Sequence, residues 1–128
     1  MHGEGLVSAS AAQCAEELTR MFTDPGIRAV VPPWGGGELA LELFPHLDMA
    51  AIALSDPTGF VGYSDISTLL LPLTAMTGIA TLHGQNLMET PYRVPDPLGS
   101  WLDVAAQPAG ASVIHGPSEF HRSGGFDS

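Results

Sequence analysis

A serine at a predicted strand-to-helix junction is the residue of this sequence best suited to chemistry. Residues 60–63 form a short run with aromatic and β-branched members, which is typical of the end of a buried strand. Ser64 follows directly, and the apolar residues from Leu69 to Met76 predict a buried helix after it. Because a serine on such a tight turn projects its hydroxyl away from the sheet, Ser64 is a candidate nucleophile.

The residues beside Ser64 offer backbone groups that suit a negative charge. Gly62 lets the chain turn closely, and the backbone N–H of Asp65 would point toward an oxyanion formed at Ser64. A serine at this position can instead act only as a helix N-cap. The usual elbow pattern also has a glycine two residues after the serine, where Ile66 stands here. Both interpretations therefore stay open on the local pattern.

A glycine loop follows an earlier predicted strand. Residues 27–31 predict a strand, two prolines end it, and Gly35, Gly36 and Gly37 precede a predicted helix over residues 38–44. Backbone N–H groups in such a loop can approach an anion without interference from Cβ atoms, so the loop could hold a phosphate or supply oxyanion donors. It could equally be a flexible turn. It lacks the Gly-Lys-Ser/Thr of a P-loop and the spacing of a dinucleotide site.

A histidine follows a third predicted strand, over residues 79–82. The imidazole of His83 could act as a general base or hold a loop as a structural group. In the tail, His115, Glu119 and His121 have no spacing typical of metal ligands, and Cys14 has no cysteine partner. We therefore expect no metal and no cofactor.

The alternation of strands and helices predicts an α/β fold with a mostly parallel sheet and flanking helices. Further helices are expected after a capping box at residues 10–13, over residues 47–54, and over residues 101–105 behind Ser100. Ligands of such sheets bind at the carboxyl ends of the strands. Since the glycine loop, Ser64 and His83 each follow a strand, we expect them at one edge of the sheet.

Length, charge and cysteine content limit the kinds of protein that this chain can be. The chain has 128 residues, which allows one domain, and 45% of them are hydrophobic, which is enough for a core. The formal net charge is −10, with four arginines and no lysine, so we expect no nucleic-acid partner and no membrane partner. The single cysteine indicates a reducing compartment, and no signal peptide or long apolar run is recognised. The sequence thus predicts a cytoplasmic protein.

Five motifs follow one another along the chain. They are Asp-Pro-Gly-Ile-Arg-Ala-Val at 24–30, Pro-Trp-Gly-Gly-Gly-Glu-Leu at 33–39, Leu-Asp at 47–48, Gly-Tyr-Ser-Asp-Ile-Ser-Thr at 62–68 and Thr-Gly-Ile-Ala-Thr-Leu-His-Gly at 77–84. In this order they resemble the serine LD-carboxypeptidase family, which includes the microcin C immunity peptidases. The resemblance covers most of residues 8–104. The chain departs from the family pattern by a third consecutive glycine and by Gln85 in place of a proline.

The resemblance implies roles for named residues. Ser64 would be the nucleophile, the N–H of Asp65 one oxyanion donor, and Gly36 or Gly37 the other. Family members are longer, and their C-terminal domain supplies the Glu and His of a Ser-Glu-His triad, for which no residue of this chain matches. The resemblance therefore implies the truncated N-terminal domain of a two-domain serine peptidase. We expect residues 1–106 to form a partial nucleophile domain and residues 107–128 a linker toward an absent C-terminal domain.

The implied function is hydrolysis of a C-terminal peptide bond. Its substrate would be a peptide or peptide conjugate, either a murein tetrapeptide in peptidoglycan recycling or a peptide–nucleotide conjugate in microcin immunity. A homodimer is the assembly expected of the full-length protein. The alternatives are a non-catalytic α/β module that binds an anion and an inactive remnant. For the isolated chain we expect exposed apolar surface, with Trp34 and Phe44 as its main contributors.

Overall fold

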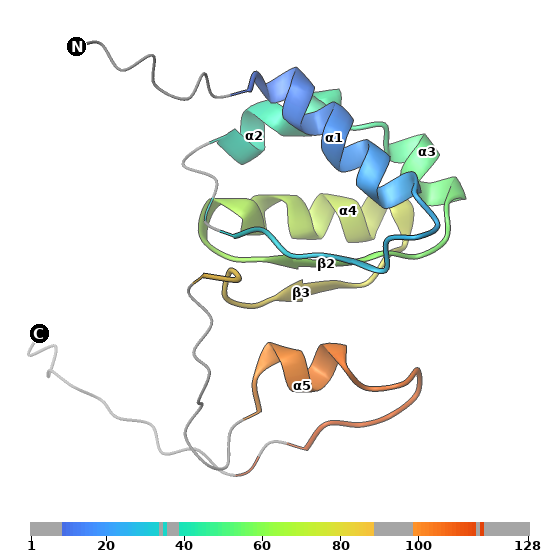
Figure 1. Ribbon diagram of the computed structural model, residues 1–128, viewed down its shortest axis with the longest axis vertical. Helices are drawn as coiled ribbons and strands as arrows, with labels where there is room; N and C mark the ends of the chain where they lie inside the picture. The colour runs from blue at the N-terminus through green and yellow to red at the C-terminus, as the bar shows by residue number, and fades with distance from the viewer. Residues whose placement is uncertain (1–8, 34, 36–38, 89–98, 115, 117–128) are drawn as a thin grey trace, which may run out of the picture. The chain divides into compact units, whose positions relative to one another are not determined.

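The computed structural model describes residues 9–33, 35, 39–88, 99–114 and 116 (Figure 1). The chain divides into two compact units, Met1–Thr90 and Pro91–Ser128. The candidate nucleophile and the three strands found among the described residues lie in the first unit. The assignment of residues 107–128 as a linker stays a prediction.

Three parallel strands form the sheet of the first unit, with the middle strand in sequence also central in space. The strands are β1 (Ala29–Val30), β2 (Gly59–Gly62) and β3 (Thr81–His83). Val30 pairs with Phe60 on one side of β2, and Gly62 pairs with His83 on the other. The predicted α/β fold with a parallel sheet is therefore confirmed.

Short helices connect and cover these strands. They are α1 (Ala11–Thr23), α2 (Leu39–Leu43), the 3-10 helix η1 (Phe44–His46), α3 (Met49–Leu54), the 3-10 helix η2 (Ser64–Leu69) and α4 (Leu70–Thr77). In the view of Figure 1, α1 to α4 lie above strands β2 and β3. The second unit contains α5 (Trp101–Ala105).

Local chemistry sets several helix ends. The capping box predicted for α1 is present, because Ser10 N–H donates to Gln13 Oε1 at 2.9 Å and Gln13 N–H donates to Ser10 Oγ at 3.3 Å. Ser100 and Asp103 repeat this arrangement at the start of α5. Helix α4 ends at Gly78, whose φ of 78° lies in the left-handed region that glycine adopts without strain.

The core of the first unit lies where α1, α3 and α4 meet the sheet. Phe22 of α1 packs edge to face against Phe60 of β2, with ring centroids 5.5 Å apart. Ile52, Leu69 and Leu73 are each at most 1% exposed. Burying one such side chain contributes about 1.5–3 kcal/mol, so this cluster fixes β2 and the helix behind it. The turn at Ser64, with the candidate nucleophile, joins these two elements.

The predicted solvent exposure of Phe44 is wrong, and that of Trp34 stays a prediction. Phe44 is only partly exposed and packs against the core cluster, because η1 turns it toward α1 and α2. Trp34 lies outside the described residues. The large apolar side chains that reach solvent include Leu54 at 90% exposure and Leu71 at 76%. No helix in the described ranges is both long and apolar enough to cross a membrane.

Candidate active site

Ser64 has an unusual backbone conformation. Its φ of 54° is the one positive φ of a non-glycine residue within the described part of the chain. Tyr63 before it is extended, and η2 begins at Ser64, so the chain reverses from strand to helix at this residue. A left-handed conformation costs a non-glycine residue about 1–3 kcal/mol. Such a strained serine between strand and helix is the geometry of a nucleophile elbow.

Gly62 lets the helix close down on the end of β2. A β-carbon at this position would lie 2.9 Å from Leu70 Cδ2 and 3.2 Å from Ile66 Cγ2. Real β-carbons essentially never approach another atom to 2.9 Å, so at least the Leu70 side chain would have to shift to admit one. Glycine two residues before Ser64 therefore suits this tight turn.

Gly35 brings the glycine loop into contact with the candidate nucleophile. A β-carbon on Gly35 would stand 3.2 Å from Ser64 Cβ and 3.4 Å from Ser64 Oγ. The approach to Ser64 Cβ would be tight, whereas the approach to Oγ is an ordinary van der Waals contact. Gly36 and Gly37, to which the sequence assigned an oxyanion donor, lie outside the described residues, so their assignment stays a prediction.

The chain after β3 crosses the carboxyl end of β2. Gly84 N–H donates to Gly62 O at 3.1 Å, which extends the pairing of β3 with β2. Leu87 N–H then donates to Pro32 O at 3.0 Å, and Met88 N–H donates to Pro33 O at 3.1 Å. The segment thus joins the exits of β3 and β1, on either side of the exit of β2.

Asn86 lies within this crossing segment and is completely buried. Its Nδ2 atom would be 3.8 Å from a β-carbon on Gly35, so it borders the contact between the glycine loop and Ser64. Sequence reasoning missed this residue. No local pattern marks it, since a buried asparagine in a loop becomes recognisable only once the surrounding strands are in place.

The Asp65 side chain reaches a different element. Its Oδ2 atom accepts a hydrogen bond of 2.9 Å from Ala40 N–H, in the first turn of α2. Its backbone N–H belongs to the first turn of η2, where N–H groups have no acceptor within the helix. The main chain of Asp65 is thus suited to an oxyanion, while its carboxylate is engaged elsewhere.

The carbonyl groups of the turn are also bonded. Ser67 Oγ donates to Ser64 O at 2.5 Å, and Thr68 Oγ1 donates to Asp65 O at 2.9 Å. Both hydroxyls thus satisfy carbonyl oxygens within η2. The N–H groups at the start of a helix point toward its N-terminal end, where a negative charge is favoured.

His83 lies near the turn, but in contact with a different side chain. Its ring centroid is 5.8 Å from that of Tyr63, and both rings are exposed. Within the described ranges, no imidazole or carboxylate is hydrogen-bonded to the Ser64 hydroxyl, and no group of three potential metal ligands occurs. His115, Glu119 and His121 lie outside those ranges.

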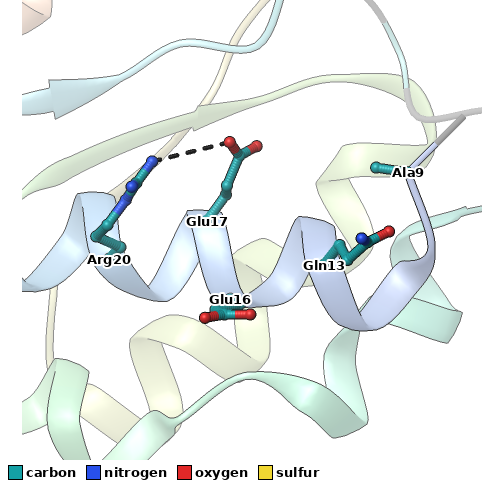
Figure 2. Close-up of a pocket in the computed structure, with 5 residues that line it drawn as sticks. All are labelled: Ala9, Gln13, Glu16, Glu17 and Arg20. Atoms are coloured by element: carbon teal, nitrogen blue, oxygen red, sulfur yellow. Dashed lines mark ion pairs between the residues drawn. The ribbon is translucent and has the colours of Figure 1, made fainter.

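A separate hollow of about 330 Å³ runs along α1 (Figure 2). It is lined by Ala9, Gln13, Glu16, Glu17 and Arg20. The dashed line in Figure 2 is the 3.8 Å ion pair between Arg20 and Glu17. Both side chains are largely exposed, and a pair of this kind contributes at most about 1 kcal/mol. None of these residues belongs to the nucleophile turn, so the hollow is a surface feature of one helix.

Known proteins are similar to this chain in sequence. A model of the LD-carboxypeptidase N-terminal domain matches residues 2–84. A Vibrio cholerae protein named putative carboxypeptidase is 36% identical over 101 residues, covering 76% of this chain and 30% of that protein. The microcin C7 self-immunity protein of Escherichia coli is 34% identical over 74 residues, covering 58% and 21%. The chain spans less than a third of the length of either relative.

The family match covers the residues that build the turn. It includes β1 and the loop that follows it as far as Gly35, the strained Ser64 and the next residue Asp65, and His83 at the end of β3. The match also extends over more than half of the chain, in agreement with the motifs recognised in the sequence. The chain therefore belongs to the LD-carboxypeptidase N-terminal domain family.

Proposed function

We propose that this chain carries the nucleophile of a serine carboxypeptidase that hydrolyses a C-terminal peptide bond. The observation that carries the proposal is the left-handed Ser64 at the end of β2, with Gly35 packed against its hydroxyl. Attack by Ser64 Oγ on the peptide carbonyl carbon forms a C–O bond. The C–N bond then breaks, the leaving amine takes up a proton, and water hydrolyses the resulting ester.

The backbone around Ser64 would stabilise the negative charge of this reaction. The Asp65 N–H at the start of η2 is one proposed donor, and Gly36 or Gly37 in the glycine loop is the other. Gly35 supports this assignment because its contact with Ser64 brings the loop to the reacting atoms. Loss of one such donor costs about 10²–10³ in rate in well-studied serine enzymes.

Activation of the serine requires a base. A serine hydroxyl is a weak nucleophile unless an adjacent group removes its proton. In longer family members this base is the His of a Ser-Glu-His triad, as the resemblance implies. Since no described residue bonds the Ser64 hydroxyl in this way, we expect negligible peptide turnover by the 128-residue chain alone.

The proposed substrates are murein tetrapeptides, cut before their terminal D-residue, or peptide–nucleotide conjugates. The name of the Escherichia coli relative, a microcin C7 self-immunity protein, supports the second class. A cytoplasmic location and a homodimeric full-length protein belong to the same proposal.

Covalent labelling with a fluorophosphonate probe tests the nucleophile. In the labelling step the Ser64 Oγ–phosphorus bond forms, fluoride leaves, and hydroxide takes the proton. The purified chain is incubated with the probe at pH 7 and at alkaline pH, where hydroxide can replace the missing base, and the modified peptide is identified by mass spectrometry. We expect an adduct confined to Ser64, and the rate of labelling should increase with pH.

Two variants control this experiment. Ser64→Ala should abolish the adduct, and the matched control Ser55→Ala should retain it.

A chimera supplies the base and tests the reaction itself. In it, this chain replaces the matching segment of the Vibrio cholerae relative, and turnover of both substrate classes is measured. Turnover that Ser64→Ala abolishes is expected. If neither the chain nor a folded chimera is labelled at Ser64, the peptidase proposal fails and an anion-binding module is favoured. Clear turnover by the chain alone would contradict the expected need for a base from elsewhere.

A further inference from the structure

We infer that the Asp65 side chain is a positioning residue that holds the glycine loop against the nucleophile turn, an inference that rests on the proposed function. Ser64 and Asp65 are consecutive, yet each contacts a different end of the same short stretch of chain. Ser64 meets Gly35, and Asp65 binds the backbone of Ala40. Gly35 therefore lies close to Ser64, and Ala40 is hydrogen-bonded to the next residue, Asp65.

The anchor at Ala40 is a specific hydrogen bond. Asp65 Oδ2 accepts from Ala40 N–H at 2.9 Å, in a partly buried position between two elements that pack together, η2 and α2. The acceptor is charged and the donor belongs to the first turn of a helix, where N–H groups lack intrahelical partners. Charge-assisted bonds of this kind are stronger than neutral ones, which suits a fixed spacing between loop and turn.

The negative charge of the Asp65 carboxylate should itself slow attack by Ser64. A negative charge one residue from the nucleophile opposes the development of a second negative charge on the substrate oxygen. If Asp65 had no positioning role, removing its charge would therefore accelerate attack by Ser64. If it positions the loop, removing it lets the loop and its proposed donors drift, which slows attack. The two explanations predict changes of opposite sign.

Three variants of the chain separate these effects. Asp65→Ala removes the acceptor, Asp65→Asn keeps an acceptor oxygen without the charge, and Asp48→Ala removes a matched cap elsewhere. Asp48 Oδ1 accepts from Ala51 N–H, also at 2.9 Å, at the start of α3. The rate of fluorophosphonate labelling at Ser64 is measured at alkaline pH. We expect about a tenfold loss for Asp65→Ala. Asp65→Asn keeps the acceptor and loses the opposing charge, so it should be labelled faster than the parent chain, and Asp48→Ala should be labelled at the parent rate.

Amide hydrogen exchange gives a second readout that needs no chemistry at Ser64. Asp65→Ala should accelerate exchange at Ala40 and leave Ala51 unchanged, whereas Asp48→Ala should do the reverse. Labelling by Asp65→Ala at or above the parent rate would overturn the inference, and so would unchanged exchange at Ala40. If the parent chain is not labelled at all, the proposed function fails, and the exchange at Ala40 still decides whether Asp65 holds the loop.

Discussion

The conformation of Ser64 costs stability, and the proposed role as nucleophile would explain why a serine stands there. The left-handed backbone aims the hydroxyl at the glycine loop, but only glycine adopts it without cost. Gly62 and Gly35 relieve the crowding on either side, and neither can relieve the strain in the serine itself. A serine kept at such a position is more readily explained by chemistry than by folding.

Replacing Ser64 by glycine should therefore stabilise the fold. We expect Ser64→Gly to unfold with a free energy about 0.5–1 kcal/mol higher than Ser64→Ala, because glycine releases the left-handed strain and loses part of the gain to chain entropy. Urea unfolding followed by circular dichroism measures the difference. An alanine variant as stable as the glycine variant would show that the turn stores no strain at this residue.

At the residue scale, the sequence predicted the backbone of the site better than its side-chain contacts. Gly62 and Ser64 were recognisable because turn chemistry is local. The bond from Asp65 to Ala40 and the burial of Asn86 were not, since both connect segments that are distant in sequence. Partners of this kind depend on strand order and register, which no single segment encodes.

At the scale of elements, capping signals were more informative than strand patterns. The capping boxes of α1 and α5 begin those helices where the sequence indicated. The strands differ from expectation by up to two residues: β1 covers Ala29–Val30 within the predicted 27–31, and β3 covers Thr81–His83 instead of 79–82. Ile79 is nevertheless buried in the core, because apolar runs predict burial and not the hydrogen bonds that define a strand.

Helix α4 packs against the core through the face that carries Leu73. Leu73 is completely buried, whereas Leu71, two residues earlier on the same helix, is 76% exposed. We expect Leu73→Ala to lower the free energy of unfolding by about 2–5 kcal/mol, since it removes core contacts and leaves a cavity. Leu71→Ala, the matched control, should change it by less than about 0.5 kcal/mol. Similar losses in both variants, measured by urea unfolding, would show that α4 is covered on both faces.

At the scale of the whole molecule, the balance between exposed apolar surface and charge decides how the chain behaves in solution. Within the described residues, β1 and β3 each pair with one neighbour only, so both outer strands have a free edge. Leu41, Leu54, Leu71 and Met76 are all more than half exposed. Unpaired edges and apolar patches favour association, whereas a net charge of −10 opposes it.

We therefore expect the purified chain to self-associate at low micromolar concentration, and to do so more strongly at high salt, where charge repulsion is screened. Sedimentation velocity across a salt series, combined with binding of a hydrophobic dye, measures both effects. The double substitution Leu54→Gln and Leu71→Gln should shift the distribution toward monomer. A sharp monomer at all salt concentrations, with cooperative unfolding and no dye binding, would contradict the expectation and indicate a self-sufficient domain.

The hydrogen bonds from Leu87 and Met88 to the carbonyls of Pro32 and Pro33 join segments that are far apart in the sequence. Each closes a long loop of chain, and we expect it to form after β3 has paired with β2, because that pairing shortens the loop that remains to be closed. On a ribosome, the serine turn emerges well before the segment that ties the strand exits together. A nascent chain that stops short of Gly84 would thus carry its strained serine on an open strand end. We expect the crossing over the exit of β2 to be complete only once the chain has been synthesised as far as Met88.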